Sequence, residues 1–156
     1  MRLLVISDTH GRSDLFFRAI ESEPEARDVI FLGDGLRECE EAQDRYPDRR
    51  FHMVRGNCDW YAGNAPALGD EMFGGKCVVF MHGHIQNVKF GPEVAIETAR
   101  DRGADLLLYG HTHTACTDYE DGLYILNPGS LGYEQQYGIA DITAGGIFTD
   151  VRRLRV

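Results

Sequence analysis

The sequence has no apolar run that approaches the roughly 20 residues of a membrane-spanning helix. Its first apolar stretch, Leu3 to Ile6, runs directly towards an acidic residue, which predicts a first strand and not a signal peptide. The chain also lacks internal repeats, linkers and low-complexity segments. With 156 residues it is long enough to bury a core. We therefore expect one cytoplasmic domain over residues 1–156, without a membrane partner.

Cysteine is scarce and scattered. The four cysteines stand at positions 39, 58, 77 and 116, and no two of them have Cys-x-x-Cys spacing. This spacing disfavours both a disulfide framework and a zinc site built from thiolates. We expect four reduced thiols.

Basic residues are in the minority. The chain has 16 Lys and Arg against 25 Asp and Glu, a formal net charge of -9. Proteins that bind long nucleic acid normally present a basic face, so this composition makes nucleic acid an unlikely partner, short oligonucleotides excepted. It does not exclude a small phosphorylated substrate.

The most informative stretch present is Leu106 to His113. An apolar run typical of a buried strand ends at Tyr109, and Gly110-His111-Thr112-His113 follows. Residues i and i+2 of an extended chain point to the same side, so both imidazoles can face one site just beyond the strand.

Four other apolar runs end in the same way. Leu3–Ser7 is followed by Asp8 and His10, Asp28–Leu32 by Asp34, His52–Arg55 by Asn57 and Asp59, and Cys77–Met81 by His82 and His84. In open α/β sheets the ligand site lies outside the carboxyl ends of the strands. Carboxylate, imidazole and amide groups that converge there are typical ligands of a divalent first-row metal.

The spacing of apolar residues and turn signals predicts the remaining elements. Helices are expected over 14–22 with Ser13 as N-cap, over 36–46 and over about 92–102. A hairpin is expected at Gly74-Gly75, and short strands over 115–120, 123–126, 137–143 and 147–155 predict an antiparallel meander. The fold class we expect is α/β, a two-sheet sandwich with helices on the outer faces.

These strand ends resemble the signature blocks of the calcineurin-like metallophosphoesterases. The blocks D-x-H, G-D, G-N-x-D, H and G-H-x-H occur in the order of that family, at Asp8–His10, Gly33–Asp34, Gly56–Asp59, His82 and Gly110–His113. The small size, Cys58 and the turn from Asn127 to Ser130 are most similar to the compact YfcE-type phosphodiesterase branch.

The resemblance implies a binuclear metal centre in an αββα sandwich. One ion would be held by Asp8, His10, Asp34 and His113, and the second by Asp34, Asn57, His82 and His111. A hydroxide that bridges the two ions would attack a phosphate ester in line. Manganese is the expected metal, with nickel, zinc, iron and cobalt as alternatives.

One position departs from the larger members of the family, which carry a histidine believed to protonate the leaving group where this chain has Cys58. A thiol is a poor replacement acid, which favours activated diesters as substrates. His84 is the candidate substitute for this leaving-group acid. Together with Asn57 and Asp59 of the third block, it forms the candidate catalytic set. Asp59 either orients a ligand or forms a turn. Cys58 is interpreted as a structural thiol, with redox sensitivity as the alternative.

Several other residues have two possible interpretations, one functional and one structural. Arg12 and Arg55 either touch a substrate phosphate or are solvated. Trp60 and Tyr61 line the substrate entrance or a subunit contact, although partial packing in the core is the commoner fate of such residues. His52 lies outside every motif and is interpreted as a surface histidine.

The leading functional hypothesis is a metal-dependent phosphodiesterase that acts on a small phosphate ester. The alternative is a non-catalytic scaffold that binds proteins, as the retromer subunit related to this branch does. A nuclease is a third option that the acidity of the chain disfavours. The resemblance also makes a homodimer or homotetramer plausible.

Overall fold

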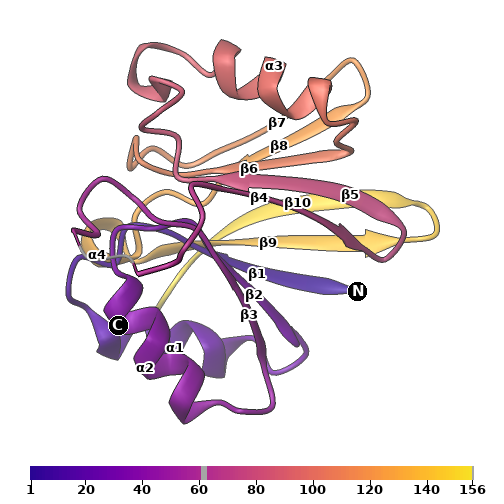
Figure 1. Cartoon of the computed structure of the whole chain (residues 1–156). Coiled ribbons are helices and arrows are strands. Elements are labelled where there is room, and N and C mark those ends of the chain that lie inside the picture. Colours follow the sequence, from indigo (N-terminus) through magenta and orange to yellow (C-terminus); the bar gives the residue numbers. More distant parts are fainter. Residues whose placement is uncertain (61–62, 156) are drawn as a thin grey trace.

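The computed structural model describes residues 1–60 and 63–155. Two five-stranded sheets pack face to face, with α1 (Ser13–Ser22) and α2 (Leu36–Arg45) outside one sheet and α3 (Glu93–Asp101) outside the other (Figure 1). This arrangement confirms the expected α/β sandwich with helices on both outer faces.

The first sheet has the order β10-β9-β1-β2-β3. Its strands are β1 (Arg2–Ile6), β2 (Asp28–Phe31), β3 (Arg50–Met53), β9 (Gln136–Thr143) and β10 (Gly146–Arg153). The first three strands are parallel, as their helical crossovers predict, and β9 pairs with the other edge of β1 in antiparallel register. The N-terminal strand is therefore central in its sheet, between β2 and a strand from the C-terminal fifth of the chain.

The second sheet has the order β4-β5-β6-β8-β7. Its strands are β4 (Leu68–Phe73), β5 (Lys76–Met81), β6 (Leu106–Tyr109), β7 (Cys116–Glu120) and β8 (Leu123–Asn127). The hairpin of β4 and β5 turns at Gly74-Gly75 as expected, and β5, β6 and β8 are parallel to one another. A short 3-10 helix, η1 (Val88–Phe90), precedes α3.

The continuous apolar runs of the central strands are explained by burial on both faces. In β1, Leu4 and Ile6 pack towards α1 and α2, whereas Leu3 and Val5 pack between the two sheets. In β6, Leu107 packs towards α3 in the same way. Strands covered on both sides show no polar alternation, which is why they read as uninterrupted hydrophobic segments in the sequence.

The prediction of a C-terminal meander is wrong. The two expected hairpins form, but β7 and β8 belong to one sheet while β9 and β10 belong to the other. Pro128 cannot donate to a strand ladder, and the chain crosses between the sheets through α4 (Leu131–Glu134). The Ser130 side chain accepts a hydrogen bond from the backbone N–H of Tyr133 and so caps this short helix, which the sequence analysis missed.

The expected N-cap of the first helix is also wrong. Arg12 occupies the cap position and Ser13 is the first helical residue. The Ser13 hydroxyl donates instead to the carboxylate of Glu41 on α2, 2.7 Å away, and so joins the two helices.

No helix within residues 1–60 and 63–155 is both long enough and apolar enough to cross a membrane.

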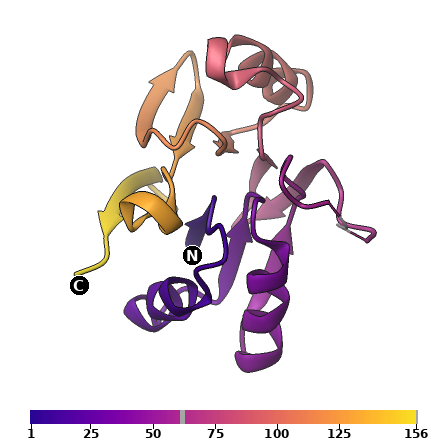
Figure 2. The same ribbon diagram turned by 90° about the vertical axis from the view of Figure 1, so that its left-hand side faces the viewer.

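The parallel strands of both sheets bring their carboxyl ends to one end of the sandwich. Figure 2 shows this end, where the loops after β1, β2, β5 and β6 face one another. Every residue of the proposed ligand set lies in these loops or in the loop after β3.

Candidate metal centre

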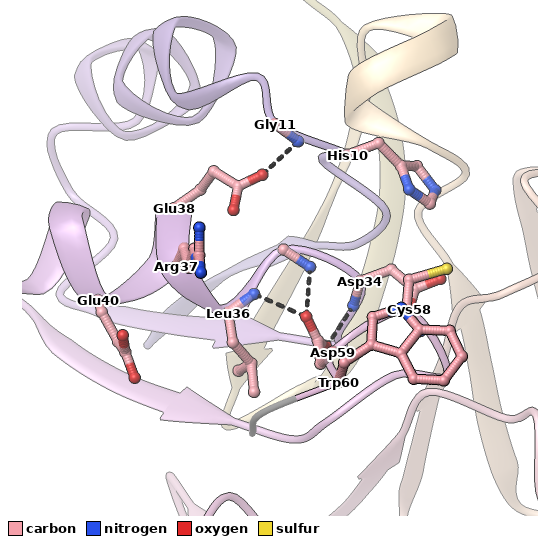
Figure 3. Close-up of a pocket in the computed structure, with 11 residues that line it drawn as sticks. His10, Gly11, Asp34, Leu36, Arg37, Glu38, Glu40, Cys58, Asp59 and Trp60 are labelled. Atoms are coloured by element: carbon pink, nitrogen blue, oxygen red, sulfur yellow. Dashed lines mark hydrogen bonds between the residues drawn. The ribbon is translucent and has the colours of Figure 1, made fainter. Parts of the chain in front are cut away.

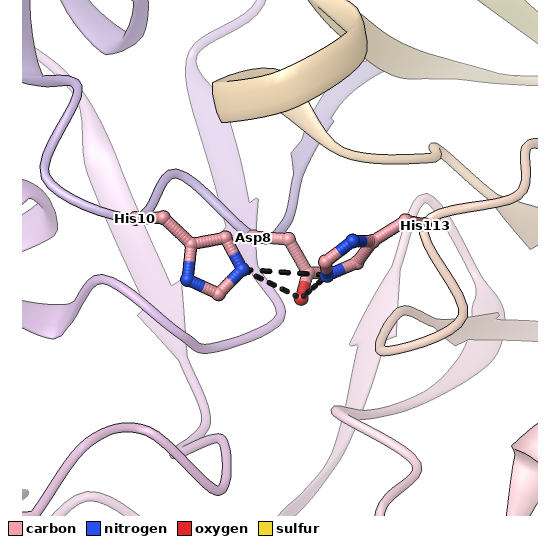
Figure 4. A group of neighbouring side chains, drawn as sticks. All are labelled: Asp8, His10 and His113. Carbon is pink, nitrogen blue, oxygen red and sulfur yellow. Dashed lines mark hydrogen bonds and ion pairs between the residues drawn. The ribbon is translucent and has the colours of Figure 1, made fainter.

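Asp8, His10 and His113 form the first group of ligand atoms. His113 Nε2 lies 3.0 Å from Asp8 Oδ1, and His10 Nε2 lies 3.3 Å from His113 Nε2 and 3.7 Å from Asp8 Oδ1 (Figure 4). Asp8 and His10 follow β1 in one sheet, while His113 follows β6 in the other. The group therefore joins residues that are more than a hundred positions apart in the chain.

Asp34, His82 and His111 form the second group, with Asn57 beside it. His82 Nε2 lies 3.4 Å from Asp34 Oδ2 and 3.1 Å from His111 Nδ1. The side-chain oxygen of Asn57 is 3.0 Å from the same nitrogen. His10, Asp34 and Cys58 form a third group that links the first two, and within each group the candidate ligand atoms lie within 4.8 Å of one another.

The hydrogen bonds of His82 fit a ligand role. Its Nδ1 lies 2.7 Å from the carbonyl oxygen of Leu32, an acceptor, so Nδ1 carries the proton and Nε2 presents a lone pair in the neutral ring. That lone pair faces other acceptor atoms of Asp34 and Asn57. Ligand atoms about 2.1 Å from a metal ion are separated from one another by roughly 3.0–3.4 Å in tetrahedral or octahedral geometry. The spacing of this cluster matches that requirement, so the residues fit a metal.

The protonation states also suit metal binding. Burial alone would raise the pKa of Asp8, but the contacts with His10 and His113 lower that pKa below its ordinary value. Burial alone would raise the pKa of Asp34 as well, but His82 and the backbone N–H of Cys58 together lower it. Burial, and then the charge of His82, lowers the pKa of His111 to about 4. Both carboxyl groups are thus ionised and His111 is neutral at pH 7, the forms that bind metals. Burial alone would lower the pKa of His82, but Asp34 and Asp8 raise it, so a metal ion bound at its Nε2 would displace a proton.

The backbone of the site is strained. Eight non-glycine residues of the described chain have φ in the left-handed region, and five of the eight belong to the proposed ligand set. They are Asp8 (56°), His10 (46°), Asp34 (60°), His111 (68°) and His113 (59°). This conformation costs side-chain-bearing residues free energy and concentrates at functional sites, where the surrounding structure holds it in place.

Two glycines allow the loops to approach one another. A Cβ on Gly56 would collide with the backbone and carboxylate of Asp34, and a Cβ on Gly110 would collide with the Ser7 hydroxyl beside Asp8. Gly56 of the block G-N-x-D is therefore required by close packing against the ligand Asp34, and Gly110 of the block G-H-x-H by close packing against Ser7, the neighbour of the ligand Asp8.

Asp59 ties the loops after β2 and β3 together. Its Oδ1 accepts hydrogen bonds from the backbone N–H groups of Gly35 (2.9 Å) and Leu36 (3.0 Å), and its Oδ2 from those of Asp34 (2.8 Å) and Gly56 (2.7 Å). These four bonds occupy both carboxylate oxygens. The structure thus places Asp59 behind the ligand Asp34, where it holds the backbone and does not face the ligand cluster.

His84 lies beside the ligand cluster, although φ of Gly83 is 106°. The centre of its ring is 5.3 Å from that of His82 and 6.1 Å from that of His111. Its Nδ1 is buried and has no hydrogen-bond partner among the described residues. Burial, with the charge of His82, lowers the pKa of His84. His84 is thus an imidazole next to the site that is not one of the proposed ligands.

Cys58 is exposed at the same end of the sandwich. Its backbone N–H donates to Asp34 Oδ1 at 2.7 Å. Partial burial and the neighbouring Asp34 raise the pKa of the Cys58 thiol to about 11, so the thiol is a weaker acid than usual. The other three cysteines are free as well.

The structure does not bring the arginine candidates into the ligand cluster. Both Nε and Nη2 of Arg12 lie 2.9 Å from the carboxylate of Asp14, in an exposed pair on its own helix. Arg55 donates to the carbonyl oxygen of Ala65 at 3.1 Å on the surface. The expected contact of either residue with a substrate phosphate therefore stays a prediction.

Two interpretations of single residues are corrected. Packing of Trp60 in the core, the commoner fate of such residues, does not occur, because Trp60 is 90% exposed. Tyr61 lies outside the described residues. His52 is not a simple surface residue: its side chain is 17% exposed, and its ring nitrogens lie 3.1 Å from Asp28 and 2.7 Å from Glu71.

Glu38 supports the site although no motif in the sequence predicts it. Its buried carboxylate accepts hydrogen bonds from the backbone of Gly11 and the hydroxyl of Thr9, and so fixes the loop that carries His10. Because α2 is rich in Glu, no local signal distinguishes this residue. The expected packing of the turn from Asn127 to Ser130 under the site is confirmed, since Ser130 Oγ donates to the carbonyl oxygen of Asp8 at 2.9 Å.

Two mixed sheets flanked by helices, with carboxylates and histidines clustered at the strand ends, define the class of protein as a metallophosphoesterase. The chain belongs to the calcineurin-like phosphoesterase superfamily, whose domain model matches residues 1–145.

Curated relatives agree with this assignment. The probable metallophosphoesterase YsnB of Bacillus subtilis is 32% identical over 136 residues, which cover 84% of this chain and 75% of that protein. The phosphodiesterase YfcE of Escherichia coli is 27% identical over an alignment of 168 positions, gaps included, which covers 90% of this chain and 88% of that protein.

Solved structures share the fold. A predicted phosphoesterase of Streptococcus pneumoniae has a TM-score of 0.78 at 24% identity, with 97% of each chain covered. The Vps29 protein of Entamoeba histolytica, solved in complex with zinc, has a TM-score of 0.67 at 24% identity, with 97% of this chain and 98% of that chain covered.

Proposed function

We propose that this protein is a binuclear metal-dependent phosphodiesterase, carried by a single cytoplasmic domain. The observation that carries the proposal is the position of Asp34, whose carboxylate belongs both to the ligand group of His10 and to that of His82 and His111. A carboxylate has two oxygens and can bind two cations at once, which a histidine cannot. Asp34 is therefore suited to bridge a pair of metal ions.

The residues around Asp34 would hold one ion on each side of it. Asp8, His10 and His113 would hold the first, and Asn57, His82 and His111 the second, with manganese the metal we favour among manganese, nickel, zinc, iron and cobalt. When bound, such a pair supplies a water of low pKa as the nucleophile and the positive charge that stabilises a phosphoryl group in transit. Asp59 acts as a positioning residue, because its carboxylate holds the backbone on both sides of Asp34.

Diesters are favoured over monoesters as substrates. Similarity to the phosphodiesterase YfcE supports this preference. Cys58 stands where the larger members of the family carry a histidine, and a thiol is a poor general acid, so leaving groups that need little protonation are favoured.

Hydrolysis of bis-p-nitrophenyl phosphate tests the proposal. Metal-stripped protein should be inactive, added Mn²⁺ should restore turnover, and Asp34→Asn should lose at least about 100-fold of kcat/KM because a carboxamide has only one oxygen to offer. Asp44→Asn, an exposed residue at the far end of α2, is the matched control. Faster cleavage of p-nitrophenyl phosphate than of the diester would refute the diester preference.

We assign His84 to the leaving oxygen of the substrate, since its ring lies beside the ligand cluster without being needed as a ligand. His84→Ala should then slow esters with an alkyl leaving group far more than esters with p-nitrophenol, which leaves without protonation. Equal effects on both substrates would exclude this role.

The alternative is a non-catalytic scaffold. It is supported by the likeness to Vps29, and because that protein was solved with zinc, metal binding alone does not separate the two functions. Turnover does: a folded, metal-loaded protein that hydrolyses neither mono- nor diesters with any divalent ion would favour the scaffold.

A further inference from the structure

A cavity of about 430 Å³ extends away from the proposed metal ligands. It begins at His10 and Asp34, follows the first turns of α2 and reaches Trp60 (Figure 3). Its volume lies within the range of small-molecule sites, roughly 300–1,000 Å³. A substrate whose phosphate lies at the metal ligands would therefore have space in this cavity for one of its ester groups.

Trp60 supplies an aromatic wall to this cavity. It is 90% exposed, although tryptophan is among the more buried residue types on average. In Figure 3 its indole lies beside Cys58, next to Asp34. The preceding residue is Asp59, whose four backbone hydrogen bonds anchor the chain to the ligand loops. The Trp60 indole thus presents an uncovered π-face beside the proposed metal centre, and the hydrogen bonds of Asp59 hold the backbone next to it.

The charges that line the cavity select against a second phosphate. Apart from the proposed ligands His10 and Asp34, the lining has three carboxylates and one guanidinium, from Glu38, Glu40, Asp59 and Arg37. Glu38 and Asp59 are already occupied by backbone N–H groups, whereas Glu40 is exposed along α2. An uncharged group that carries hydrogen-bond donors fits this lining, and a polyphosphate or an extended nucleic acid does not.

From these features we infer that the cavity binds the nucleoside of a nucleotide phosphodiester, with the base stacked on Trp60 and the sugar hydroxyls towards the acidic lining of α2. A nucleoside combines the two properties that fit this cavity, a planar uncharged ring and at least one sugar hydroxyl that can donate a hydrogen bond. This inference rests on the proposed phosphodiesterase function and names the substrate class of the same site.

Fluorescence gives a direct binding test, because Trp60 is the single tryptophan of the chain. Adenosine 5′-monophosphate, added to protein loaded with zinc, should quench the tryptophan emission in a saturable manner. Ribose 5-phosphate and inorganic phosphate, which lack the base, should leave the emission unchanged. Absence of quenching by the nucleotide, or equal quenching by all three, would overturn the inference.

Kinetics with two matched diesters give the second test. The p-nitrophenyl ester of thymidine 5′-monophosphate and methyl p-nitrophenyl phosphate share a leaving group and differ in the nucleoside. Base–aromatic stacking corresponds to roughly a 5- to 150-fold effect. Trp60→Ala should therefore lose that factor in kcat/KM for the thymidine ester, mainly through KM, and change the methyl ester less than twofold, while Trp60→Phe should retain most of the preference.

Phe90→Ala is the control, because Phe90 is 94% exposed and does not line the cavity. If both esters are hydrolysed without preference for the nucleoside, the nucleoside site is wrong and the phosphodiesterase remains. If neither ester is hydrolysed but the nucleotide quenches Trp60, the phosphodiesterase is wrong and the nucleoside site remains. A Trp60→Ala variant that changes only the oligomeric state would assign Trp60 to a subunit contact and overturn the inference.

Discussion

Five ligand residues combine a chemical role with an unfavourable backbone conformation. A left-handed φ costs a residue with a Cβ roughly 1–2 kcal/mol, and glycine avoids this cost. Asp8, His10, Asp34, His111 and His113 have this conformation. Glycine would cost less conformational free energy at these five positions. The presence of Asp and His there is consistent with residues retained for function and not for stability.

His111 allows this conflict to be measured. His111→Gly and His111→Ala both remove the imidazole, but only glycine adopts φ of 68° without strain. We expect the glycine variant of the metal-free protein to be more stable than the alanine variant by about 1 kcal/mol in the free energy of unfolding, measured by urea denaturation.

The same pair of substitutions at His82 is the control, because His82 is not among the residues with positive φ. There the alanine variant should be the more stable one, by about 0.5–1 kcal/mol. The same order of stability at both positions would show that the backbone of His111 carries no strain.

For single residues, the sequence predicted the identity of the ligands and not their geometry. The motifs that contain Asp8, Asp34 and His111 can be recognised in the sequence, and the structure brings their ligand atoms together. The left-handed conformations and the role of Glu38 were not predicted, since both depend on contacts with strands that are remote in the sequence.

Single strands are linked across the sandwich by His52. Its ring lies on β3 and contacts Asp28 of β2 in its own sheet and Glu71 of β4 in the opposite sheet. Arg50 contacts both oxygens of Asp28, at 2.8 Å and 2.6 Å. The buried carboxylate of Asp28 therefore joins β2 to β3, and His52 extends this link to Glu71 of β4 in the opposite sheet.

Asp28 should make the stability of the sandwich depend on pH. Burial alone would raise its pKa, but Arg50 and His52 lower it below the ordinary value. A lowered pKa in the folded state stabilises the fold above the ordinary pKa of Asp, and this contribution is lost as the pH falls through the folded pKa. Asp28→Asn should cost about 1.5–3 kcal/mol of unfolding free energy at pH 7.

Urea denaturation across the acid range measures this effect. The difference between wild type and Asp28→Asn should shrink as the pH falls below about 4. Asp44→Asn, an exposed substitution on α2, should show no such trend. A difference that stays constant down to low pH would mean that the charge of Asp28 does not stabilise the fold.

At the scale of elements, the type of each long element was predictable and its partner was not. The strand at Leu106–Tyr109 and the helix that became α3 have clear patterns. The pairing of β8 with β6, and of β9 with β1, depends on contacts between residues far apart in the chain. A local turn signal, such as Gly145-Gly146, predicts a hairpin but not the sheet to which the hairpin belongs.

The ligand cluster joins the two sheets of the whole molecule. Asp8, His10, Asp34 and Asn57 come from loops of one sheet, and His82, His111 and His113 from loops of the other. A metal bound here would bind only the folded chain with both sheets in place, because the unfolded chain does not bring these residues together.

Metal should therefore raise the thermal stability of the protein. At a free metal concentration roughly 100-fold above the Kd, binding contributes about 2.7 kcal/mol. For a chain of this size that corresponds to an increase in Tm of roughly 5–10 °C over the protein treated with a chelator. Differential scanning calorimetry with and without Mn²⁺ measures the shift.

Asp34→Asn should lose most of this shift, whereas Asp44→Asn should keep it. A shift that persists in Asp34→Asn would mean that Mn²⁺ stabilises the protein at some other place.

For the whole molecule, the α/β class and the position of the site at the strand ends were both predictable from the sequence. The crossing of the chain from β8 in one sheet to β9 in the other was not.

The central position of β1 has a consequence for the synthesis of the protein. One edge of β1 pairs with β2 soon after both leave the ribosome, but the other edge pairs with β9, whose residues 136–143 are synthesised more than a hundred residues later. At about 5–20 residues per second, that edge stays unpaired for several seconds. The nascent chain thus carries an open strand edge until β9 emerges, and a chaperone that shields such edges would act before then.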